Sequence, residues 1–127
     1  MSAIGNEIGT FSGKVTNQSI NKDKSTSVTI EADNAGPFGA IVSTGTFHPP
    51  SNPDALTGLY NDIGFTLNAS ESPIPFEGQG VWRETAPGGH WEAKVCAVNA
   101  TGMRVMAVLN FKFSDRSVTA TIYELDS

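Results

Sequence analysis

Residues 76–98 read FEGQGVWRETAPGGHWEAKVCAV, in which two strand-like runs flank the turn-rich segment TAPGG. The stretch holds both tryptophans, the only cysteine and one of the two histidines. Proline and glycine residues between two such runs are typical of a hairpin turn. We therefore predict a β-hairpin made of residues 76–84 and 90–98, and the rest of the fold follows from how its neighbours pair with it.

Strand signals continue on both sides of this hairpin. Period-2 alternation and turn residues dominate the chain, whereas helical periodicity is almost absent. The predicted strands cover residues 7–15, 27–32, 38–47, 63–69, 76–84, 90–98, 103–113 and 117–125. Eight antiparallel strands in sequence favour a closed up-and-down barrel over a two-sheet sandwich, because closure removes exposed edges. We predict a single all-β domain over residues 1–127, which resembles calycin (lipocalin-type) and streptavidin barrels in strand count alone.

Charge and composition narrow the classes of partner. The net charge is −5, and the eight Lys and Arg residues are scattered, so we expect neither nucleic acid nor an anionic membrane surface as a partner. No apolar run approaches 18 residues. The single cysteine, Cys96, is expected to be a small buried residue. With no disulfide and no secretory signal in view, we expect a cytoplasmic protein.

The orientation of the focal hairpin decides which residues can do chemistry. Composition favours burying the odd-numbered side, which carries most of the apolar residues. Turn lengths favour the even-numbered side. A four-residue turn over residues 99–102 pairs Glu92 with Leu109 and His90 with Phe111. A loop over residues 70–75 pairs Phe65 with Gly80, and we expect the even-numbered side to face the interior, although one β-bulge would reverse either register.

An interior of this kind supports a leading hypothesis and two alternatives. We predict that the barrel binds a small, mainly apolar molecule. The predicted ligand-binding residues are Trp82, Lys94, Phe65, Phe111 and Leu109. The first alternative is a cofactor-independent isomerase, cyclase or lyase, with catalytic residues Glu84, His90 and Glu92 in acid–base roles. These groups would otherwise form a surface ion pair beside a loop. The second alternative is a structural module that contacts carbohydrate or protein.

Two further expectations concern metals and self-association. The chain has no His-x-His, HExxH or C-x-x-C spacing, so we expect no metal and no cofactor. An even-numbered interior would leave a broad apolar patch outside, which predicts a homodimer or higher homo-oligomer. The patch would contain Trp91, Val95, Met106, Val108 and Tyr123.

Overall fold

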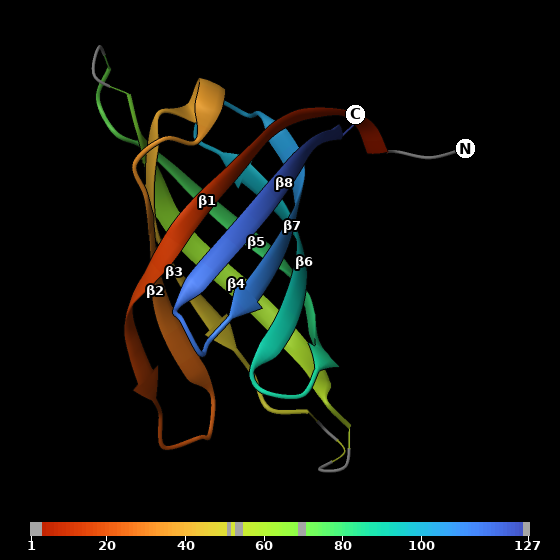
Figure 1. The fold of residues 1–127 in the computed structure, drawn as a ribbon. Helices are drawn as coiled ribbons and strands as arrows, with labels where there is room; N and C mark the ends of the chain where they lie inside the picture. The colour runs from red at the N-terminus through yellow and green to blue at the C-terminus, as the bar shows by residue number, and fades with distance from the viewer. Residues whose placement is uncertain (1–3, 51, 53–54, 69–70, 126–127) are drawn as a thin grey trace.

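The computed structural model describes residues 4–50, 52, 55–68 and 71–125 as one closed barrel (Figure 1). The eight strands are β1 (Ile4–Ile20), β2 (Thr26–Ala32), β3 (Ala40–Phe47), β4 (Thr57–Leu67), β5 (Ile74–Ala86), β6 (His90–Asn99), β7 (Arg104–Lys112) and β8 (Ser117–Leu125). Each strand pairs antiparallel with the next, and β8 pairs with β1. The predicted all-β, eight-stranded antiparallel barrel is confirmed, and the sandwich is wrong.

A short 3-10 turn, η1 (Gly36–Phe38), lies across one end of this barrel between β2 and β3 (Figure 1). Gly36 begins the turn, Pro37 follows it in the first turn, and Gly39 ends it with a φ of 76°. Among the described residues, no helix reaches the length and hydropathy that crossing a bilayer requires. The end of the barrel beside η1 is the one that contains the cavity described below.

The β7–β8 hairpin has the inner face that its sequence predicts. Phe111 pairs with Val118, and Leu109 pairs with Ala120. The loop is two residues longer than a tight turn at Asp115-Arg116 would allow, so the register is displaced by two residues in total. Because side chains alternate with a period of two, the displacement keeps Leu109 and Phe111 on the inner face.

The two strands of the β5–β6 hairpin do not bury residues of the same parity, and here the predicted register is wrong. The backbone N–H of Asn99 donates to the carbonyl oxygen of Met103, so only residues 100–102 close the β6–β7 loop; this pairs Trp91 with Phe111 and displaces the register by one. Between β5 and β6 a bulge at Thr85 pairs Glu84 with Trp91. Even-numbered residues of β5 and odd-numbered residues of β6 therefore share the interior. Both faces of the hairpin contain apolar residues because each strand buries a different parity.

The β4–β5 pairing is displaced by five residues from the prediction. Tyr60, not Phe65, lies opposite Gly80, and Asp62 lies opposite Gly78. An odd displacement reverses the parity of β4, so its inner face is Tyr60, Asp62, Gly64 and Thr66. Phe65 is consequently 49% exposed on the outer wall.

Aromatic rings fill the end of the barrel that is far from η1. The ring of Phe47 lies at their centre, and the stacked rings of Trp82 and Trp91 have centroids 4.4 Å apart. Ring centroids lie around Phe47 at 4.8 Å (Tyr60), 5.0 Å (Trp91), 5.1 Å (Phe111), 5.9 Å (Trp82) and 6.0 Å (Phe113). The Trp82 indole N–H donates to the carbonyl oxygen of His48 at 2.8 Å, so a polar group in this cluster has a partner. This half of the interior therefore belongs to the hydrophobic core.

Candidate functional site

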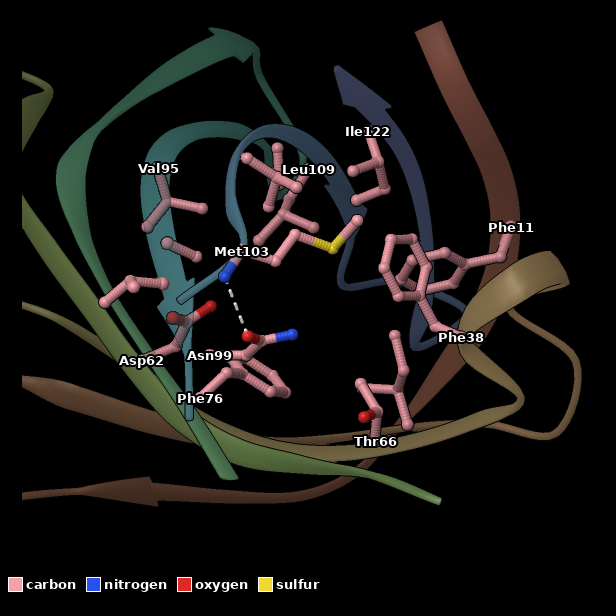
Figure 2. A pocket seen from close by; sticks show the side chains of 15 residues that line it. Phe11, Phe38, Asp62, Thr66, Phe76, Val95, Asn99, Met103, Leu109 and Ile122 are labelled. Carbon is pink, nitrogen blue, oxygen red and sulfur yellow. Dashed lines mark hydrogen bonds between the residues drawn. The ribbon is translucent and has the colours of Figure 1, made fainter. Parts of the chain in front are cut away.

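A cavity of about 80 Å³ occupies the interior beside η1 (Figure 2). Its wall is mainly aliphatic and aromatic, and its residues come from η1, from every strand except β2 and from the loop after β6. The lining residues are Phe11, Phe38, Ile41, Asp62, Thr66, Phe76, Val95, Ala97, Val98, Asn99, Met103, Val105, Ala107, Leu109 and Ile122. Met103 lines the cavity and is 46% exposed, which places a route to solvent beside the β6–β7 loop.

The carboxyl group of Asp62 is the feature that sets this cavity apart from ordinary core. Asp62 lies mid-strand in β4, and the barrel interior leaves it only 6% exposed. Among the described residues its Oδ1 atom is buried and has no hydrogen-bond partner. Figure 2 shows the side chain among the apolar groups of the wall, near Val95 and Phe76. A buried carboxylate without a partner is costly, so such groups concentrate at functional sites.

Asp62 has a glycine opposite it on each neighbouring strand, and the one on β5 makes room for its carboxyl group. Asp62 pairs with Gly45 of β3 and with Gly78 of β5. A methyl group added at Gly78 would lie 2.8 Å from Asp62 Oδ1 and 2.7 Å from a methyl carbon of Val95. A residue with a side chain at position 78 would therefore push into the cavity or displace the carboxyl group.

Burial changes the acidity of Asp62. Desolvation raises the pKa of its carboxyl from 3.8 to about 6, because no described group compensates the charged form. The group is thus ionised at neutral pH and becomes neutral in mildly acidic solution. Its buried neighbour Tyr60 has a pKa raised well above 10 by desolvation and by the Asp62 charge, so Tyr60 stays neutral over this range.

The side-chain oxygen of Asn99, another polar atom of the wall, is less free to bind. The Oδ1 atom of Asn99 already accepts from the backbone N–H groups of Thr101 and Met103, each at 3.0 Å, and from the Thr101 hydroxyl at 2.6 Å. These bonds hold the β6–β7 loop at the rim; the one from Met103 is drawn in Figure 2. None of the described lining residues is Lys, Arg or His. In the part of the chain that the structure describes, no three His, Cys, Asp or Glu side chains could hold a metal ion together.

Of the predicted ligand-binding residues, only Leu109 lines the cavity. Trp82 and Phe111 are interior, yet they belong to the aromatic cluster at the far end. Lys94 and Phe65 were placed on the wrong face: both are exposed, because β6 and β4 have the opposite parity to that predicted. The wrong parities follow from the one-residue and five-residue register displacements described above.

The three predicted acid–base residues do not form one site. Glu92 lies on the outer wall, where its Oε1 atom accepts from the guanidinium of Arg83 at 3.0 Å. Glu84 lies on the inward-facing side of β5 and pairs with Trp91. His90 pairs with Ala86, on the other side of the bulge. The predicted Glu84–His90 pairing is therefore wrong, because the Thr85 bulge offsets the two strands by one residue.

Because β6 has the opposite parity to that predicted, the apolar patch expected on the outer wall also has a different composition. Trp91 packs in the aromatic cluster and Val95 lines the cavity, so neither lies on the surface. Met106, Val108 and Tyr123 remain on the outer parity of β7 and β8. Cys96, predicted to be buried, is exposed for the same reason. Among the described residues, the most exposed large apolar side chain is Ile20 of β1, and several others, including Leu59, Ile63 and Val81, lie on β4 and β5.

Sequence reasoning missed the central residue of the cavity. Asp62 was passed over because the alternate residues Ile63, Phe65 and Leu67 are the more apolar set of β4, which favoured turning them inward. The usable signal was the pair of glycines: Gly45 and Gly78 lie on the inner faces of the adjacent strands, where they leave space for a larger side chain.

No protein-family model, curated protein or solved structure matches this chain.

Proposed function

We propose that the protein binds a small, mainly apolar molecule in the cavity beside η1. One observation carries this proposal: an apolar cavity contains a single buried carboxyl group whose Oδ1 atom lacks a partner among the described residues. Small-molecule sites in proteins have this composition, with apolar walls and a few polar groups that fix the orientation of the ligand. The mouth of a β-barrel is also a common place for such sites.

The size of the cavity bounds the ligand. Drug-sized ligands occupy roughly 300–1,000 Å³, and an engineered cavity of about 150 Å³ admits benzene. A cavity of about 80 Å³ thus takes a group of a few carbon atoms. A longer molecule would insert one end and extend past the half-exposed Met103 at the rim. Entry from the other end is blocked by the aromatic cluster around Phe47.

Acid–base catalysis by Glu84, His90 and Glu92 has less support, because Glu92 is held by Arg83 on the outer wall. The exposed Cys96 and the absence of a second cysteine are compatible with a cytoplasmic location, which we include in the proposal.

Methyl NMR provides the direct test, because neither tryptophan lines the cavity to serve as a fluorescent reporter. The probe is 3-methylbutan-1-ol, titrated into protein with labelled Met, Leu, Ile and Val methyl groups. We expect saturable shifts at Met103, Leu109 and Ile122. Shifts spread over the outer wall, or no saturable shift, would overturn the proposal.

A filled-cavity variant sharpens this experiment. Ala107 is nearly buried in the wall, so Ala107→Leu places additional carbon atoms in the cavity. Asn110→Leu introduces the same leucine side chain on the exposed side of the same strand and serves as the control. We expect the first variant to lose the probe-induced shifts and the second to keep them; retention by both would place the probe elsewhere.

A further inference from the structure

The Asp62 carboxylate gives the cavity a charge for a ligand to match. We propose that the ligand is a small alkylammonium ion, whose apolar part fills the cavity and whose ammonium group pairs with Asp62. This inference rests on the proposed function and adds the chemical class of the ligand. It is carried by the placement of one carboxyl group among apolar side chains and aromatic rings.

The first argument is the missing partner. Asp62 is only 6% exposed, and its Oδ1 atom has no hydrogen-bond partner among the described residues. An ionised carboxylate is an acceptor only, so it needs a donor, and a charged donor forms the strongest pair. A ligand ammonium group supplies both the donor hydrogens and the opposite charge.

The second argument concerns where a positive charge can come from. The described lining residues include no Lys, Arg or His. The basic residues nearest to the cavity in register, such as Lys94 of β6, project from the outer wall. Among the residues that the structure describes, the lining therefore offers the carboxylate no counterion, and a ligand can supply one.

Aromatic rings provide a third, independent argument. Phe11, Phe38 and Phe76 come from β1, η1 and β5, and all three line the same cavity. Figure 2 shows the rings of Phe11 and Phe38 on one side of the space, with Phe76 beside Asn99. The face of an aromatic ring attracts a cation, whereas it gives an anionic ligand no such gain. Figure 2 places Phe76 on the same side of the space as Asp62, where its ring suits an ammonium group, whereas Phe11 and Phe38 lie across the space and suit the alkyl part.

The test compares three ligands that share one branched alkyl group. The probes are 3-methylbutylammonium, 3-methylbutan-1-ol and 4-methylpentanoate, each titrated at pH 8 into the full chain with methyl NMR detection. A charge-assisted hydrogen bond should make the ammonium probe bind roughly tenfold to a hundredfold more tightly than the alcohol. The carboxylate probe should bind most weakly, because it would bring a second negative charge into the cavity.

Two variants assign any preference to Asp62. Asp62→Asn removes the charge with little change of shape, and we expect it to bring the ammonium probe to within about twofold of the alcohol. Glu77→Gln removes one charge from the outer face of the neighbouring strand β5 and should leave all affinities unchanged. The ratio of ammonium to alcohol affinity in the unmodified protein is decisive even if a variant folds poorly.

The outcomes separate this inference from the proposed function. If the alcohol binds in the cavity and the ammonium probe binds no more tightly, the inference is wrong and the proposed function stands. If the preference survives in Asp62→Asn, the cation binds elsewhere and the inference is again wrong. If none of the three probes shifts the cavity methyl groups, both are wrong.

Discussion

Asp62→Asn removes the buried charge of the cavity while keeping the side chain almost the same size. In the folded protein the pKa of Asp62 is raised from 3.8 to about 6 by desolvation, so the folded state binds this proton more tightly than the unfolded state does. Between about pH 4 and pH 6 the stability contributed by Asp62 therefore falls as the pH rises, and above that window the loss is complete. The variant lacks this loss.

The size of the effect follows from the shift. About two pKa units at about 1.36 kcal/mol each give roughly 3 kcal/mol of destabilisation in the unmodified protein at pH 8. At pH 4 Asp62 is neutral when folded and only roughly half ionised when unfolded, so most of this penalty is absent. We expect the stability advantage of Asp62→Asn over the unmodified protein to be about 2–3 kcal/mol larger at pH 8 than at pH 4.

Urea denaturation at the two pH values measures the difference, and all other carboxyl groups cancel between the two proteins. Glu77→Gln is the matched control, because Glu77 is exposed on β5 and its loss should give no comparable pH-dependent gain. An advantage that differs by less than about 1 kcal/mol between pH 4 and pH 8 would refute the reasoning that Asp62 is buried without a partner.

Three further predictions concern other buried and exposed groups. Tyr60→Phe removes a buried hydroxyl that has no partner among the described residues, so urea denaturation should show unchanged stability or a gain of about 1 kcal/mol; a loss above about 1 kcal/mol would reveal a hydrogen bond to that hydroxyl. Gly45→Ala places a methyl group against the ring and hydroxyl of the fully buried Tyr60, and we expect it to lower the unfolding free energy by about 1–3 kcal/mol, whereas unchanged stability would show that the ring can move aside. Cys96 is exposed, so a thiol reagent such as Ellman's reagent should modify it stoichiometrically in the folded protein, and protection until unfolding would contradict its outward position.

The number and order of strands could be predicted from sequence because alternation and turn residues repeat along the chain. The Asp115-Arg116 turn gave the right inner face for β7 and β8 even though its register was displaced by two residues, since an even displacement preserves parity. Closure into a barrel followed from the strand count and the need to cover edges.

The parity of β6 could not be predicted, because it depends on single residues in two turns. The Asn99 side chain and Gly102, with a φ of 89°, close a three-residue loop where four residues were expected. At the other end of β6, the extra residue Thr85 forms a bulge in β5. Either change moves every side chain of a strand to the other face, and composition does not report it.

The site was missed for a different physical reason. In β4 the inner face contains Asp62 and Gly64, while the outer face contains Ile63 and Phe65. Hydrophobic alternation assigns the more apolar side of a strand to the core. The assignment fails for β4, because its inward-facing residues line a cavity and include a carboxylate and a glycine. Ile63 is 60% exposed as a result.

A crystal structure of the protein soaked with 3-methylbutylammonium would test the central claim most directly. The account predicts electron density for the alkyl group between Phe76 and Leu109 in the cavity beside η1, with the nitrogen atom within hydrogen-bond distance of the Asp62 carboxylate. A cavity that contains only ordered water at a saturating concentration of the probe, or a probe bound on the outer wall, would contradict it.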